Sequence, residues 1–374
     1  MIPTTAPHGA AAPRGASGRA GNPRALRIAG PLILVTAALA ALVWGLALGG
    51  GAAPLVIGDP GPFVRWGLPA ARLGVNLAAA GMVGALVTAL FALKAGEREF
   101  DTALDAASVS AAVFTLAAAA TGFLTFLDAF NPVLDAGPEF GAQLGRFLTE
   151  TEPGRTWLIT TIAGAVLTIL AFAVRSWTAT FFTALLAVAA LVPMGTQGHS
   201  GTEANHTAAI MALVLHIIAA AVWLGGLLLM VIIRPIVDRR TMAAAMARYS
   251  SIALAAFVVV AIAGTVRAAI GVGTWAGLAS PYGVIVLLKV VALLSIGILA
   301  AYYRRRQIPR MKTDAAPRRF WSLIALELAF MGIAIESSMC PTMCMLNRYS
   351  WYAFTGPEVT QNSRSSPTVH STVR

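Results

Sequence analysis

AAIMALVLHIIAAAVWLGGLLLMVII, residues 208–233, is an apolar run whose single ionisable side chain is His216. A helix that crosses the hydrocarbon core of a bilayer needs about 20 consecutive, mostly apolar residues. This run meets that requirement, and the chain contains eight further runs of the same kind. They lie near residues 27–48, 73–93, 104–127, 157–174, 178–195, 249–271, 282–303 and 320–336. The sequence therefore predicts an all-α fold, a polytopic transmembrane helical bundle of about nine helices.

Composition supports a membrane protein and argues against a soluble one. Of the 374 residues, 57% are hydrophobic and only 11% are charged, whereas a soluble domain carries about 25% charged residues. The chain also contains no Walker loop, no G-x-S-x-G and no H-E-x-x-H sequence, which are common signatures of soluble enzymes. We therefore expect a multi-pass protein of the cell membrane that is not an enzyme.

The net charge of +11 comes mainly from Lys and Arg residues in short loops between the apolar runs. If the N-terminus is cytoplasmic, most of these residues fall in cytoplasmic segments, such as 94–98, 234–248 and 304–319. This distribution agrees with the positive-inside rule. The charge thus indicates an N-in topology within membrane lipid, and it gives no sign of a nucleic-acid partner.

Four regions differ in composition. Residues 1–26 are rich in Ala, Gly, Pro and Arg, which predicts a disordered cytoplasmic leader. Residues 27–156 hold the first three helices and a long outer loop, 128–155, in which a short interfacial helix is expected. Residues 157–336 hold the other six helices. Residues 337–374 have an atypical composition, and we expect them to be disordered.

Polar groups gather at the outer ends of the later helices. At 1.5 Å per residue, His216 lies about 27 Å from Arg234, which marks the inner end of its helix. The same count places Met194 about 28 Å from the inner end of its own helix. His199 and His206 occupy the outer segment between these two residues. Because imidazole and thioether groups suit copper, we predict a copper site among His199, His206, His216 and Met194.

Two alternatives remain open for this site. An interfacial histidine is often merely solvated, and a methionine at a helix end often only packs. In addition, His206 and His216 are ten residues apart, so on one continuous helix about 15 Å would separate them. Either the helix begins after His206, or there are two sites in series.

Other polar residues near the membrane modify this expectation. Arg267 reaches the level of His216, and Lys289 lies somewhat deeper, so their positive charge opposes cation binding there. We expect them to pair with Glu203, Asp128 or Asp135, or to extend to the surface. Glu327 lies about 12 Å from the inner end of the last helix. Residues 223–227, WLGGL, are expected to allow close helix packing, because small residues do so in membranes.

Several motifs resemble one family. The segment LVLHIIAAAVWLGGLLLM (213–230), preceded by GHS (198–200), is similar to the CopD copper-resistance family of bacterial inner-membrane proteins. YGVIVLLK (282–289) and LIALELAFMG (323–332) support the resemblance, and the first three helices look like the additional N-terminal portion of actinobacterial members. By this resemblance we expect the type that is without the cytochrome c oxidase assembly domain that often follows in those members.

The resemblance implies copper handling at the membrane, with His199 and His216 as the supposed ligands. We therefore expect copper import or permeation, with copper ions and an extracytoplasmic copper-binding protein as partners. A scaffold or assembly subunit for respiratory complexes, or a haem-b electron-transfer protein, is the alternative.

The segment from 337 to 374 departs from the family pattern. It contains both cysteines, Cys340 and Cys344, among three methionines. Thiolates and thioethers favour Cu(I), so these residues would suit a Cu(I) cluster. The cysteines could instead form a disulfide, or a frameshift could have replaced the native end.

Overall fold

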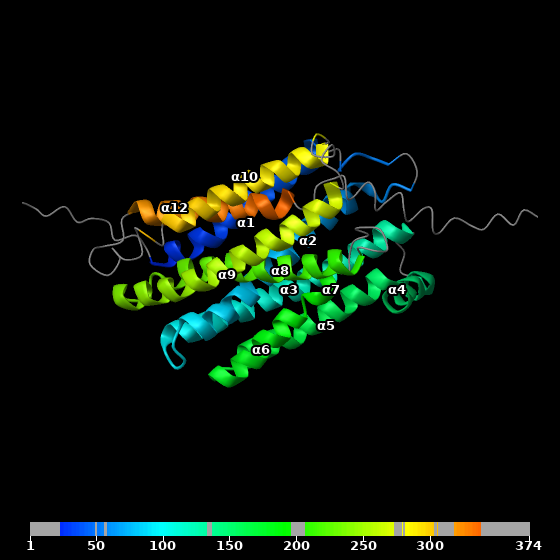
Figure 1. Ribbon diagram of the computed structural model, residues 1–374. Coiled ribbons are helices and arrows are strands. Elements are labelled where there is room, and N and C mark those ends of the chain that lie inside the picture. Colours follow the sequence, from blue (N-terminus) through cyan, green and yellow to red (C-terminus); the bar gives the residue numbers. More distant parts are fainter. Residues whose placement is uncertain are drawn as a thin grey trace, which may run out of the picture.

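The computed structural model describes residues 23–48, 51–55, 58–132, 137–195, 206–272, 279, 281–302, 305 and 318–337. Within these residues the chain forms a bundle of parallel and antiparallel helices and no strands (Figure 1). The helices are α1 (Pro23–Leu48), α2 (Gly61–Ala92), α3 (Arg98–Phe130), α4 (Pro138–Glu150), α5 (Glu152–Ala173), α6 (Trp177–Ala189), α7 (Val192–Gly195), α8 (His206–Ile233), α9 (Arg239–Val272), α10 (Pro281–Tyr302) and α12 (Arg318–Ser337).

The predicted helical bundle is confirmed, since each of the nine predicted ranges contains a helix in the described part of the chain. Seven spans are long and apolar enough to cross a membrane, from α1, α2, α3, α5, α6 with α7, α8 and α9. In α10 and α12, the described residues contribute the shorter apolar segments Lys289–Tyr302 and Trp321–Gly332. The chain is therefore an integral membrane protein.

Helix α2 lies at the centre of the bundle. It packs against α3 and α8 along much of its length and also contacts α6 and α9. In the most apolar 18-residue stretch of α2, 72% of the residues are buried, compared with 17% in the corresponding stretch of α9. Helix α1 packs against α12, and α10 lies at one edge with few contacts (Figure 1).

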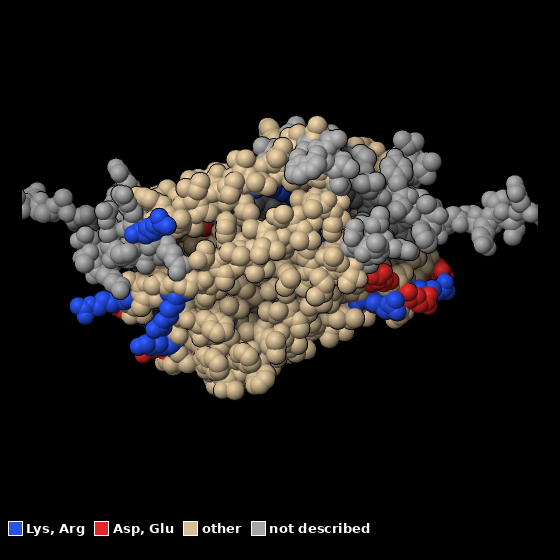
Figure 2. Space-filling view, viewed as in Figure 1, with Lys and Arg blue, Asp and Glu red and all other residues tan. Residues whose placement is uncertain are grey.

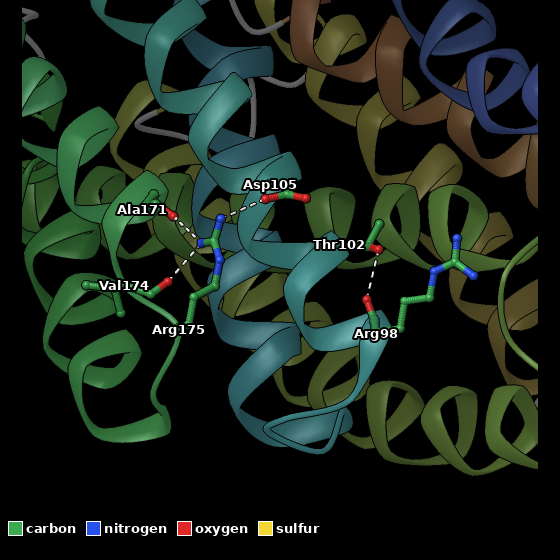
Figure 3. Close-up of polar contacts among 6 residues, drawn as sticks. All are labelled: Arg98, Thr102, Asp105, Ala171, Val174 and Arg175. Carbon is green, nitrogen blue, oxygen red and sulfur yellow. Dashed lines mark hydrogen bonds and ion pairs between the residues drawn. The ribbon is translucent and has the colours of Figure 1, made fainter.

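The charged residues lie mainly at the two ends of the bundle, separated by a broad uncharged band (Figure 2). We call the end that holds Lys94, Arg98, Arg175 and Arg239 the inner end, because the sequence predicts it to be cytoplasmic. Here the Arg175 guanidinium pairs with Asp105 of α3 at 2.8 Å and also donates to the carbonyl of Ala171 at 3.0 Å (Figure 3). This contact joins the end of α5 to α3.

One predicted helix is divided into two. The sequence predicts a single helix over 178–195, whereas α6 ends at Ala189 and α7 begins at Val192. Pro193 accounts for the break, because its ring clashes with the carbonyl four residues earlier and it has no N–H to donate. That carbonyl belongs to Ala189, the last residue of α6.

The outer loop contains the expected short helix, α4, next to the outer end of α3. Asn131 caps the C-terminus of α3: its backbone is left-handed with φ of 41°, and its N–H donates to the Leu127 carbonyl. Phe147 of α4 is almost fully buried, and its ring centroid lies 5.6 Å from that of Phe126. Aromatic packing therefore holds α4 against the bundle.

Candidate functional site

The structure describes part of the predicted copper site. His199 falls in segment 196–205, which lies outside the described residues, and the cysteines of the 337–374 segment also lie outside them. His206 is the first residue of α8. His216 and Met194 are both described and both half-buried.

His216 points from α8 toward α9. A Cβ added at Gly264 of α9 would lie 3.8 Å from Cε1 and 3.9 Å from Nδ1 of the His216 ring. The Nδ1 atom is buried and makes no hydrogen bond within the described part of the chain. The carbonyl of Val260 faces the ring, but it does not reach hydrogen-bond geometry with Nδ1. The imidazole is thus held against α9, with the Val260 carbonyl beside it and a buried Nδ1 atom that makes no hydrogen bond of normal geometry.

Two cationic side chains lie near this imidazole. Arg267 of α9 and Lys289 of α10 both lie close enough to His216 to act on it electrostatically. Arg267 Nη1 also donates to the carbonyl of Ala209 at 3.5 Å. Ala209 lies two turns before His216 on α8, so the guanidinium is directed toward the outer end. The predicted acidic partners Glu203 and Asp135 lie outside the described residues.

Met194 and His216 occupy different sides of α8. Gly195, the neighbour of Met194, packs against Val214 so closely that an added Cβ would overlap the valine side chain. Two positions along a helix correspond to about 200° of rotation, so Val214 and His216 face nearly opposite directions. The structure therefore places Met194 at the predicted level but does not bring it onto the His216 face.

Within the described residues, no three His, Cys, Asp or Glu side chains come together in a metal-binding group. Helix α8 is continuous from His206 to Ile233. About 15 Å of helix therefore separates the backbones of His206 and His216. This favours two sites in series over one site shared by these two histidines.

A second polar region lies in the inner half of the bundle. Tyr249 of α9 donates its hydroxyl to the Trp223 carbonyl at 2.5 Å, and its ring packs against Gly226 of α8. Thr88 of α2 borders the same glycine and is fully buried; its hydroxyl has no hydrogen-bond partner among the described residues. Glu327 of α12 is 4% exposed and acts electrostatically on Tyr249. We call Thr88, Tyr249 and Glu327 the inner polar cluster.

The sequence signals only part of this cluster. Counting residues along the last helix places Glu327 in the inner half, but nothing in the sequence pairs it with Tyr249 or Thr88. The expected packing role of the WLGGL segment agrees with the structure. A Cβ at Gly225 would overlap the Ala80 carbonyl oxygen of α2 and lie 2.9 Å from the Gly84 Cα.

Two family models match the chain. Residues 63–208 match the N-terminal domain of copper resistance protein D-like proteins, and residues 243–338 match copper resistance protein D. The matches run from α2 to the first turn of α8 and from α9 to the end of α12, so His216 lies between them. No curated protein and no solved structure matches the chain. The two matches follow one another along a single membrane-spanning helical bundle, and the chain belongs to the CopD copper-resistance family.

Proposed function

We propose that this protein carries copper ions across the cell membrane, most simply as an importer. His216 is the copper ligand within the membrane, and His199, His206 and Met194 are the groups that copper meets first at the outer end. An extracytoplasmic copper-binding protein is the expected donor. The proposal rests on family membership together with the buried Nδ1 of His216, which makes no hydrogen bond of normal geometry.

The environment of His216 favours passage over storage. A polar group buried in a membrane without a partner is costly, so such a group is expected to serve a function. Imidazole is a good ligand for both oxidation states of copper. The nearby charges of Arg267 and Lys289 weaken the binding of any cation at this position. An ion that crosses a membrane needs binding strong enough to enter and weak enough to leave.

Copper content of cells tests the proposal. Cells that express the wild-type protein are expected to accumulate more copper than cells with an empty vector, measured by elemental mass spectrometry. His216→Ala should reduce the accumulation to the vector level at equal amounts of protein in the membrane. His8→Ala, which removes a histidine from the N-terminal leader, should behave as wild type.

Two results would count against the proposal in different ways. If His216→Ala cells contain as much copper as wild-type cells, His216 is not a copper ligand on the route. If the wild-type protein lowers cellular copper and His216→Ala abolishes that effect, the route exists but the direction is export.

A further inference from the structure

The Glu327 carboxyl is an acidic group buried deep in α12. It lies nine residues from Arg318 at the start of the helix, which is about 14 Å along its axis. Its neighbours Ile324 and Leu328 are 2% and 0% exposed, so this face of α12 is turned into the bundle. Glu327 makes no ion pair with any described residue. An ionised carboxylate in such a place needs a positive charge from elsewhere.

Tyr249 lies at the same depth but cannot supply this compensation. It is ten residues from Arg239 at the start of α9, which is about 15 Å along the axis. Its hydroxyl hydrogen is donated to the Trp223 carbonyl, and a phenol has only one hydrogen to donate. Tyr249 therefore has no hydrogen left to donate to Glu327 and offers only oxygen lone pairs.

The cationic side chains near Glu327 either make other contacts or lie at other depths in the membrane. Arg234, the residue after α8, lies 4.0 Å from the ring centroid of Trp321, nearer the inner end of α12. Arg248 donates to the carbonyl of Ala92 at the end of α2. Lys289 and Arg267 act on His216 in the outer half. Helix α1, the main neighbour of α12, has its two charged residues, Arg24 and Arg27, among its first five residues at the inner end and none after them.

Met331 adds a thioether on the same face of α12 as Glu327. Met331 lies four residues after Glu327, and residues at this spacing are neighbours on a helix surface. Its side chain is 6% exposed and belongs to the same core as Leu328. Thioether sulfur favours Cu(I). The carboxylate of Glu327 would supply the negative charge that balances the positive charge of a Cu(I) ion inside the membrane. Met331 lies outward of Glu327, on the side toward His216.

We propose that Glu327 and Met331 form a second copper-binding site, in the inner half of the membrane, which receives copper that has passed His216. This inference rests on the proposed function, because it is the next position along the same route. Tyr249 is a positioning residue near this site, because its hydrogen bond to the Trp223 carbonyl of α8 fixes the orientation of the phenol.

Cu(I) binding to the purified full-length protein tests the second site. The probe is Cu(I) itself, titrated under reducing conditions against a coloured Cu(I) chelator. Glu327→Gln and Met331→Leu should each lose one bound copper ion relative to wild type. In a His216→Ala background, Glu327→Gln should remove one further copper ion. Both substitutions preserve side-chain volume, and Glu327→Gln removes a buried charge, so the fold should persist.

Matched controls and outcomes separate this inference from the proposed function. Glu150→Gln, at an exposed acid, and Met211→Leu, at a methionine that is 56% exposed, should bind copper as wild type. If His216→Ala loses copper while Glu327→Gln and Met331→Leu do not, the second site is overturned and the proposed function stands. If only Glu327→Gln and Met331→Leu lose copper, the second site stands and the assignment of His216 as a copper ligand is wrong. If none of the variants loses copper, both fail.

Discussion

Replacing Gly225 with alanine is expected to destabilise the bundle because α2 and α8 cross at this residue. The added methyl group would overlap the Ala80 carbonyl oxygen and lie 2.9 Å from the Gly84 Cα. Both are backbone atoms, which cannot rotate away as the end of a flexible side chain can. The helices must therefore separate along a contact that also contains Gly226 and Tyr249.

The size of the effect follows from two opposing contributions. Overpacking a well-packed core costs typically 1–3 kcal/mol, and an overlap with backbone belongs at the upper end, about 3 kcal/mol. Alanine in place of glycine in a helix stabilises it by about 1 kcal/mol. The net loss is then about 2 kcal/mol, or roughly a thirtyfold decrease in the ratio of folded to unfolded protein.

Gly45→Ala is the matched control, because a Cβ at Gly45 of α1 would meet nothing within 4 Å. This variant should be as stable as wild type or slightly more stable. Both variants would be unfolded by titrating mixed micelles with sodium dodecyl sulfate, with helix content followed by circular dichroism. Equal unfolding midpoints for Gly225→Ala and Gly45→Ala would refute the close crossing of α2 and α8.

Three further predictions follow from individual contacts. Tyr249→Phe removes the donor to the Trp223 carbonyl and should lower the free energy of unfolding by about 1 kcal/mol in the same titration; an unchanged midpoint would contradict the bond. Gly264→Leu should push the His216 ring aside and reduce copper binding, whereas Gly264→Ala leaves ordinary contacts and should bind as wild type; equal copper binding by both variants would argue against this placement of the ring. The hydrogen bond from Arg65 holds the pKa of Asp59 below its usual value of 3.8. Because this folded-state pKa is depressed, the pair should stabilise the protein at neutral pH and lose its effect as the pH falls below that value. Asp59→Asn should therefore lower the unfolding midpoint at neutral pH but not in acid, and the same difference at both pH values would count against the pairing.

The helices could be predicted from the sequence because each apolar run is long enough to cross a membrane by itself. Their ends were harder to predict. Helix α2 begins at Gly61 and α9 at Arg239, about three turns before the predicted starts near 73 and 249. Charged residues such as Arg65 end an apolar run without ending a helix. Pro193 had the opposite effect, since it divided one apolar run into two helices.

The sequence predicts how deep the candidate site residues lie in the membrane, but it does not predict the direction in which their side chains point. Counting residues places Met194 and His216 at the same level, and the contact between Gly195 and Val214 agrees with that. The rotation of each helix about its own axis is set by tertiary packing, which the count does not contain. For the same reason, the proximity of Tyr249 and Glu327 has no signal in the sequence: it depends on how α8, α9 and α12 pack.

X-ray absorption at the copper edge of the copper-loaded, purified protein tests the central claim that His216 holds copper within the membrane. A copper-bound imidazole gives a characteristic multiple-scattering pattern from its outer ring atoms. We predict that wild-type protein shows this pattern and that His216→Ala loses an imidazole contribution and binds less copper. An identical spectrum and an identical copper content in the His216→Ala protein would contradict the claim.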